Sequence, residues 1–265
     1  NQNKNAIDDF NKAIKLDPKD AENYQFRGCY FYNLNKYTEA LKDFNKAIEL
    51  DPEDAESFQM RGRTYHYGFN QNKNAIDDFN KAIKLDPQNA SNYYYRGCSF
   101  YNLDKYSEAV KDFNKAIKLD PQNASNYYYR GISKNFLKNY RGSIKDLNKA
   151  IKLNPKDAYA YYFRGSSNEQ LKNYFEAIKD LNKAIKLDPE EPNFYTYRGR
   201  VKNLLGKHKE AIKDANKAMN IDKTCVFALT CRGYSNYSLK NYNQAIKDAE
   251  KIIKLKPENP YAHYL

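Results

Sequence analysis

Hydrophobic and polar residues alternate along this chain with the period of an α-helix. In residues 90–103, ASNYYYRGCSFYNL, the apolar or small positions Tyr93, Gly97 and Phe100 are three or four residues apart. In residues 105–119, KYSEAVKDFNKAIKL, a second stripe runs through Tyr106, Ala109, Val110, Phe113, Ala116 and Ile117. Spacings of i, i+3, i+4 and i+7 favour amphipathic helices. The pattern therefore predicts two helices in this segment.

The residues between these stripes predict where each helix begins and ends. Asn89 precedes the first helix, where its side chain can accept a free backbone N–H as an N-cap. Asp-Pro follows the second helix, because proline disfavours helical geometry in the residue before it. Only two or three residues separate the helices, which forces them to be antiparallel. The segment is thus expected to be a helical hairpin. Equivalent N-caps are Asp20, Asp54, Asn123 and Asp157.

The hairpin pattern recurs along the whole chain. The sequence DFNKAIKLDPQNASNYYYRG stands at residues 78–97 and again at 112–131. Each step between hairpins is 34 residues except one of 35, whose extra residue lies around Gly68 in an expected longer inter-helix turn. Repeats of this length indicate units that bury their apolar faces only against one another. We therefore expect one solenoid over residues 1–265. It would comprise a leading second helix at 1–18, seven complete hairpins over about 21–257 and a trailing first helix at 258–265.

One hairpin carries the aromatic, glycine, alanine and proline positions of a known family. They are Tyr93, Gly97, Tyr106, Ala109, Phe113, Ala116 and Pro121. With this pattern over nearly its whole length, the chain resembles the tetratricopeptide repeats. The resemblance implies an all-α, right-handed superhelical solenoid of antiparallel helix pairs, whose first helices line a concave groove. The aromatic at Phe113 becomes Ala215 and Ala249 in the last two hairpins, which we expect to be looser or differently contacted.

An arginine precedes the glycine of every hairpin, where the family usually has leucine. An aspartate stands in every second helix, so we predict an ion pair within each hairpin, for example between Arg96 and Asp112. The alternative is a row of arginines that binds the phosphates of an extended polyanion. We prefer the structural interpretation, because charges near a core are normally paired.

The resemblance also implies which residues face the groove. Tyrosine offers a large contact area at little entropic cost, so a tyrosine and asparagine surface suits a peptide or helical segment of a partner. The alternative for each ring is that it packs between adjacent first helices. Arg63 and Arg200 are the groove cations expected to meet an acidic partner residue. The other expected peptide-binding residues are Tyr94, Tyr95, Tyr101, Asn102, Tyr128, Tyr129, Asn135 and Tyr162, with Tyr32 and Asn33 nearby.

The net charge of +12 raises the question of nucleic acid. Lysines such as Lys111, Lys115 and Lys118 follow one face of a second helix, which the resemblance places mainly outside. Such a stripe is more typical of a solvated surface, so we expect no nucleic-acid partner. No apolar run approaches 18 residues, so we expect no membrane span. The four cysteines fit free thiols and a cytoplasmic location. Because the chain begins with Asn1 inside a repeat, we expect a piece of a longer protein.

Catalytic motifs are not evident in the sequence. The three histidines, His66, His208 and His263, are scattered singly, and no metal-binding or phosphate-loop motif occurs. We therefore expect neither an enzyme nor a cofactor. Two function classes remain. The first is a protein-interaction scaffold that binds its partner in the groove, and the alternative is a solenoid that assembles with itself through its ends.

Overall fold

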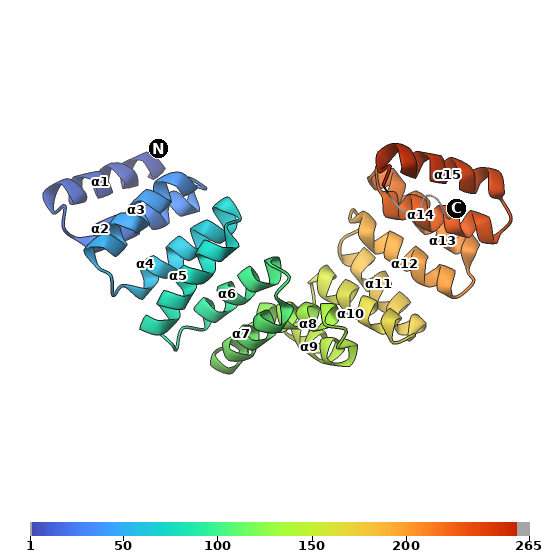
Figure 1. Ribbon diagram of the computed structural model, residues 1–265, viewed down its shortest axis with the longest axis horizontal. Coiled ribbons are helices and arrows are strands. Elements are labelled where there is room, and N and C mark those ends of the chain that lie inside the picture. Colours follow the sequence, from blue (N-terminus) through green and yellow to red (C-terminus); the bar gives the residue numbers. More distant parts are fainter. Residues whose placement is uncertain (1, 259–265) are drawn as a thin grey trace. The chain divides into compact units, whose positions relative to one another are not determined.

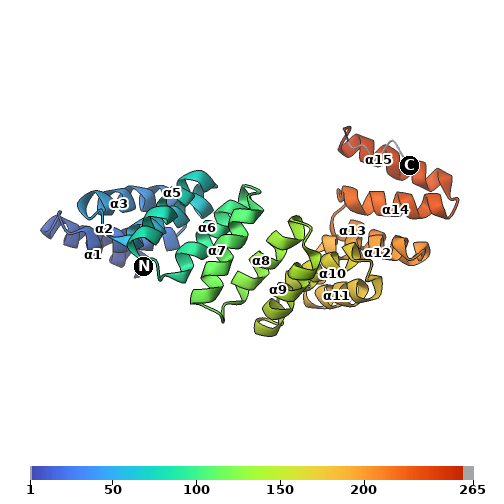
Figure 2. The ribbon, with the colours of Figure 1, turned by 60° about the horizontal axis from the view of Figure 1, so that its bottom comes forward.

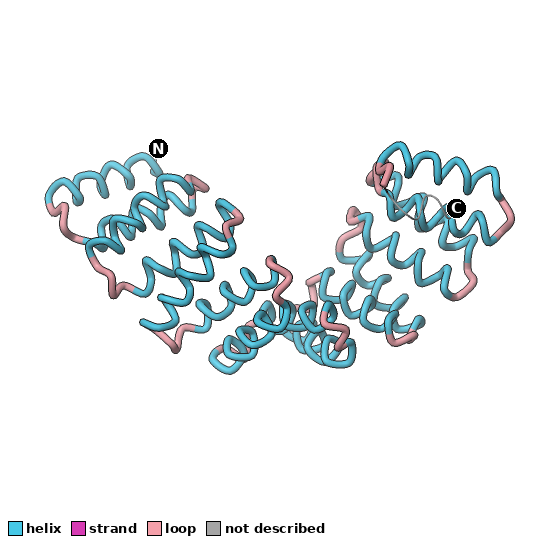
Figure 3. Tube along the Cα trace, in the orientation of Figure 1, coloured by secondary structure: helices cyan, strands magenta, loops and turns pink. Residues whose placement is uncertain are grey.

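The computed structural model describes residues 2–258, and all regular secondary structure within that range is helical (Figures 1 and 3). The elements are α1 (Gln2–Leu16), α2 (Ala21–Asn33), α3 (Tyr37–Leu50), α4 (Ala55–Arg63), the π-helical turn η1 (Thr64–Gly68), α5 (Asn72–Leu85), α6 (Ala90–Asn102), α7 (Tyr106–Leu119), α8 (Ala124–Phe136), α9 (Tyr140–Leu153), α10 (Ala158–Gln170), α11 (Tyr174–Leu187), α12 (Pro192–Leu204), α13 (His208–Ile221), α14 (Val226–Ser238) and α15 (Tyr242–Leu255). The predicted all-α solenoid of antiparallel hairpins is confirmed. Of the trailing helix expected at 258–265, residues 259–265 lie outside the described residues.

The chain forms two compact units, Asn1–Ser133 and Lys134–Leu265, which divide within α8. In unit 1, the hairpins α2–α3, α4–α5 and α6–α7 follow one another in sequence order (Figure 2). Unit 2 repeats this arrangement with α10–α11, α12–α13 and α14–α15. A single solenoid over residues 1–265 stays a prediction.

The predicted caps set the ends of the helices. The side chain of Asp20 accepts from the Glu22 N–H at 2.9 Å, and that of Asn89 accepts from the Ser91 N–H at 3.0 Å. Each satisfies a backbone donor that the first helical turn leaves free. Second helices such as α5 end two residues before a proline, and the residue between, Asp86 in α5, has left the helical region.

Small residues let the two helices of a hairpin approach closely. A Cβ atom on Gly97 would lie 2.9 Å from the ring of Phe113, and Ala109 and Ala116 are fully buried. Where alanine replaces this ring, at Ala215, the Sγ of Cys231 lies at the corresponding glycine, 2.9 Å from a Cβ built there. The penultimate hairpin is therefore differently contacted, as expected, because the next hairpin supplies the missing volume.

The predicted ion pairs form within the hairpins. Arg96 donates from Nε and Nη2 to the carboxylate of Asp112 at 2.8 and 2.6 Å, and from Nη1 to Asn80 of the preceding second helix at 2.7 Å. The guanidinium also lies 5.7 Å from the centre of the Tyr93 ring. Each of these arginines thus joins successive repeats. The structural interpretation, an ion pair within each hairpin, is confirmed, and the arginines do not form a free row for binding phosphates. The same pairing is made by Arg27–Asp43, Arg61–Asp78, Arg164–Asp180, Arg198–Asp214 and Arg232–Asp248.

The single 35-residue repeat differs from the expectation. Its extra residue was expected to lengthen the turn, but the first helix instead widens into the π-helical turn η1. Its last residue, Gly68, lies against Tyr37 of the preceding hairpin, so closely that a Cβ would be 2.5 Å from the ring. Only glycine permits this approach, because any larger side chain would overlap the ring. The wider turn exposes Tyr67.

Candidate functional site

Tyrosine rings on the first helices of unit 1 form a nearly continuous surface. Tyr67 lies 6.1 Å from Tyr95, and Tyr129 lies 5.8 Å from Tyr94 and 6.0 Å from Tyr101, measured between ring centres. These contacts join η1 to α6 and α6 to α8. We call this surface the tyrosine face and define it by Tyr32, Tyr67, Tyr94, Tyr95, Tyr101 and Tyr129.

The rings of the tyrosine face both pack and remain accessible. Tyr94 touches Tyr95 and Phe113, and burial raises its pKa well above the usual range. Tyr101 is half-buried, and its burial raises its pKa to about 12. Tyr128 contacts Tyr129 at 5.1 Å and is also half-buried. The contacts to neighbouring helices fix the rings in place, while the partial exposure leaves a surface that another molecule could touch.

The two predicted asparagines have different surroundings. Asn102 is exposed, and its amide is 3.5 Å from Asn72. Asn135, at the start of unit 2, donates to the hydroxyl of Ser167 at 2.8 Å and so links two hairpins. Of the pair, Asn102 offers the more accessible side chain.

In unit 2, the predicted Tyr162 is enclosed by aromatic neighbours. Its ring lies 5.4 Å from Phe194 and 5.2 Å from Tyr197. Burial raises its pKa to about 12. This ring contributes mainly to packing between α10 and α12.

Arg200, the predicted cation of unit 2, has an internal partner. Its Nη2 lies 3.2 Å from the carboxylate of Glu169, and its guanidinium lies 5.2 Å from the centre of the Tyr197 ring. Glu169 is buried and also accepts from the Tyr197 hydroxyl at 2.9 Å. The charge of Arg200 is therefore compensated within the protein.

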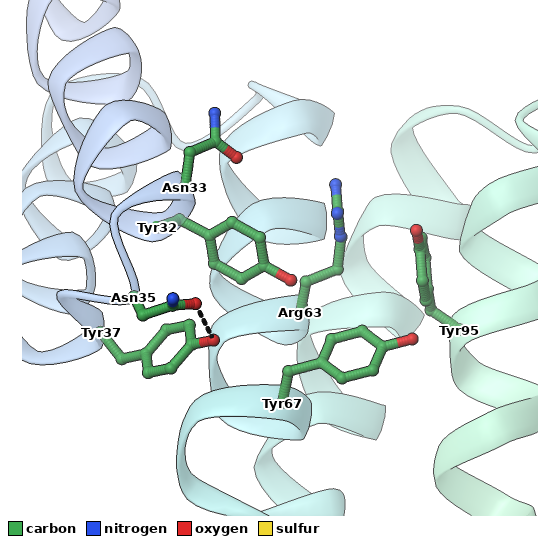
Figure 4. A pocket seen from close by; sticks show the side chains of 7 residues that line it. All are labelled: Tyr32, Asn33, Asn35, Tyr37, Arg63, Tyr67 and Tyr95. Atoms are coloured by element: carbon green, nitrogen blue, oxygen red, sulfur yellow. Dashed lines mark hydrogen bonds between the residues drawn. The ribbon is translucent and has the colours of Figure 1, made fainter.

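Arg63, the equivalent cation of unit 1, has a different environment. Its guanidinium lies 5.0 Å from the centre of the Tyr32 ring and 4.9 Å from that of Tyr95, between the two (Figure 4). Its Nη1 contacts the sulfur of Met60 at 3.2 Å, and its Nε is buried without a hydrogen bond. Within residues 2–258 it forms no ion pair.

A pocket of about 370 Å³ opens beside Arg63 (Figure 4). On its floor, the Tyr37 hydroxyl donates to Asn35 at 2.8 Å. Burial raises the pKa of Tyr32, although the positive charge of Arg63 opposes this shift. The lining residues of the pocket are Tyr32, Asn33, Asn35, Tyr37, Arg63, Tyr67 and Tyr95. Arg63 is the charged residue among them, so the pocket carries a positive charge.

The sequence did not identify several of these residues. Tyr67 stands five residues after its hairpin glycine, where Asn33 and Asn102 stand in theirs, so counting repeat positions would have brought it to the groove. Asn35 and Tyr37 belong to the turn and second helix of the preceding hairpin, outside the first-helix positions. Glu169 was missed as the partner of Arg200. Glu169 stands four residues after its hairpin glycine, where an earlier hairpin has Tyr32. A comparison of this position between hairpins would therefore have identified Glu169 as an acidic neighbour for Arg200.

Other classes of site are not evident over residues 2–258. No helix there has the length and apolar character needed to cross a bilayer. No group of histidine, cysteine and acidic residues in that range could hold a metal ion.

One lysine of the stripe on the second helix α7 packs against an aromatic ring. The ammonium of Lys115 lies 5.7 Å from the centre of the Tyr93 ring.

Successive hairpins joined side by side define a helical-repeat protein of the kind that serves as an interaction scaffold. Family models described as "Tetratricopeptide repeat" match residues 1–20, 21–54, 90–123, 124–157, 158–191 and 232–259, and one described as "TPR repeat" matches residues 69–104. These matches together cover more than half of the sequence, and the chain belongs to the tetratricopeptide repeat family. A comparison with curated proteins finds no match.

Several solved structures share the fold. YrrB, described as "a TPR protein with an unusual peptide-binding site", is 24% identical with a TM-score of 0.61, over 68% of this chain and 92% of YrrB. A tetratricopeptide repeat protein from Parabacteroides merdae is 18% identical with a TM-score of 0.72, over 92% of this chain and 96% of that one. A chain of the APC/C hetero-tetramer Cut9–Hcn1 is 17% identical with a TM-score of 0.72, over 99% of this chain and 51% of that one.

Proposed function

We propose that this chain is an interaction scaffold that binds an extended or helical segment of a partner protein on the tyrosine face of unit 1. The observation that carries the proposal is the run of partly exposed tyrosine rings held in place by contacts between neighbouring first helices. Rigid aromatic side chains give much contact area and lose little entropy on binding, which is why they dominate binding energy at interfaces. The fold is similar to that of YrrB, whose description includes a peptide-binding site, so peptides are the first ligands to test.

A library of random dodecapeptides, acetylated and amidated at their ends, tests this proposal directly. The chain should select a subset of sequences with micromolar affinity. Replacing both Tyr101 and Asn102 with alanine should weaken the binding of the selected peptides by roughly tenfold or more, because interface tyrosines often contribute over 1 kcal/mol. Affinities would be measured by fluorescence anisotropy.

The matched control is Phe175→Ala on α11, because Phe175 is 76% exposed on a second helix and lies outside the tyrosine face. This variant should bind like the unmodified chain. If no peptide is selected and the mass in sedimentation rises with concentration, the self-assembling alternative replaces the scaffold.

A further inference from the structure

We propose that the pocket beside Arg63 is a carboxylate subsite that receives a glutamate or aspartate side chain of the bound segment. This inference rests on the proposed scaffold function and assigns a specificity to one end of the tyrosine face. The pocket lies in unit 1, between the α2–α3 hairpin and the repeat that contains the π-helical turn η1.

The first step concerns the state of the Arg63 guanidinium. It lies between the rings of Tyr32 and Tyr95, 5.0 and 4.9 Å from their centres, so little side-chain entropy is left to lose on binding. Its edge retains donors that no protein carboxylate accepts among residues 2–258, and the buried Nε has no hydrogen-bond partner. An oriented guanidinium with free donors matches the two oxygens of a carboxylate.

The second step is the comparison with Arg200 at the same repeat position. There the chain itself provides the carboxylate, from Glu169, and Arg200 Nη2 lies 3.2 Å from it. At the position of Glu169, the hairpin before Arg63 has Tyr32 instead. The ion pair between Arg200 and Glu169 in unit 2 is thus the same kind of interaction that an acidic side chain of a partner would make with Arg63.

The third step is the shape and polarity of the pocket. Its volume of about 370 Å³ exceeds that of a single carboxylate side chain, so part of the peptide backbone can enter as well. The hydroxyls of Tyr67 and Tyr95 make no hydrogen bond within the described part of the chain, and both are available to donate. Asn35 accepts from Tyr37 at 2.8 Å through its amide oxygen, and its amide nitrogen is a further donor. A carboxylate accepts from all of these groups.

The fourth step is the origin of the pocket. The extra residue of this repeat widens the helix at η1, and Gly68 lets it approach Tyr37 of the preceding hairpin. The wider turn places Tyr67 beside Arg63 (Figure 4). Insertions that produce such turns are frequent at functional sites.

The test compares two variants with opposite designs in the capped dodecapeptide library. Arg63→Gln removes the cation, whereas Tyr32→Glu keeps Arg63 and places beside it the carboxylate that Arg200 already has. The unmodified chain should select peptides with glutamate or aspartate at one fixed position. Both variants should lose that preference, and the best acidic peptide should bind them roughly tenfold more weakly. Circular dichroism and thermal melting would verify that each variant is folded.

A peptide cycle separates charge from shape. Glutamate-to-glutamine substitution in the selected peptide should weaken binding to the unmodified chain by roughly tenfold but leave binding to Tyr32→Glu unchanged. Selection of peptides without an acidic position, or an acidic preference that survives in both variants, would overturn the subsite and leave the scaffold proposal standing. Selection only from a matched library with free C-termini would also overturn it, because the carboxylate would then be terminal. No selection from either library would instead reject the scaffold function.

Discussion

A single arginine side chain connects two hairpins at each repeat. Arg96 donates to Asp112 of its own hairpin and to Asn80 of the preceding one. Asp112 is buried, so its carboxylate depends on this guanidinium for the hydrogen bonds that water would otherwise provide. The pairing is therefore expected to be more important for avoiding an unpaired buried charge than for net attraction.

This dependence predicts the effect of replacing Arg96 with leucine, the usual residue of the family. Arg96→Leu leaves the Asp112 carboxylate without its cation and should lower the free energy of unfolding by about 2–4 kcal/mol. Adding Asp112→Asn removes the charge at nearly the same size and should recover part of that loss. Urea denaturation followed by circular dichroism measures both changes. Equal stability of Arg96→Leu and the unmodified chain would show that the pair is unimportant.

The same variant has a predictable pH dependence. Burial raises the pKa of Asp112 above its ordinary value of 3.8, although Arg96 opposes the shift. A carboxyl with a raised pKa stabilises the folded state below its unfolded pKa, and that stability is lost as pH rises through its folded pKa. Without Arg96 the folded pKa rises further, so Arg96→Leu should be most destabilised at neutral pH. The difference from the unmodified chain should shrink on acidification toward pH 3.8, and a constant difference would argue against this mechanism.

At the scale of the element, the inter-helix turns contain a strained residue. Lys172 adopts a φ of 61° and Lys138 one of 60°, in the left-handed region that disfavours residues with a Cβ. At the corresponding turn of a later hairpin the chain has Gly206, with a φ of 72°. The turn geometry thus persists whichever residue the sequence supplies.

Lys172→Gly should therefore stabilise unit 2 by roughly 0.5–1 kcal/mol, since glycine removes the strain at a modest entropic cost. The reverse change, Gly206→Lys, should destabilise by a similar amount, because a Cβ there meets no atom within 4 Å and only the backbone strain remains. Thermal unfolding checks both predictions, since the melting temperature should rise in Lys172→Gly and fall in Gly206→Lys. A melting temperature that falls in Lys172→Gly would contradict the argument.

The whole molecule is stabilised by contacts between neighbours, so its interior opens locally rather than only by complete unfolding. The cysteines report such opening. Burial raises the pKa of Cys98 to about 12 and that of Cys29, which is only half-buried, to about 11. Both thiols are therefore protonated and shielded in the native chain.

Alkylation at pH 8 should modify Cys29 first and Cys98 at least about tenfold more slowly, because less thiolate forms and a wider opening is needed. Mass spectrometry of peptides from a time course with iodoacetamide gives both rates. In 6 M guanidinium the two rates should become equal, which controls for differences in local sequence. Similar native rates would mean that the hairpin containing Cys98 opens as easily as the one containing Cys29.

Much of the architecture was predictable from the sequence, because its determinants are local or repeat at a fixed distance. The 34-residue spacing, the N-caps such as Asn89 and the glycines opposite bulky rings specify each hairpin by itself. The pairing of Arg96 with Asp112 could be predicted as well, since a buried cation needs a partner and the aspartate recurs in register with it.

The candidate site was less predictable, because it depends on which side chains of different hairpins meet. Arg63 and Arg200 have the same repeat position, but only the folded chain distinguishes them, through Tyr32 in one neighbour and Glu169 in the other. The extra residue was visible in the sequence, yet its place in the helix rather than in the turn was decided by packing of Gly68 against Tyr37. Sequence periodicity determines the repeated unit, whereas the charge left unpaired at its surface is a tertiary property, because it depends on distances between side chains that no local pattern encodes.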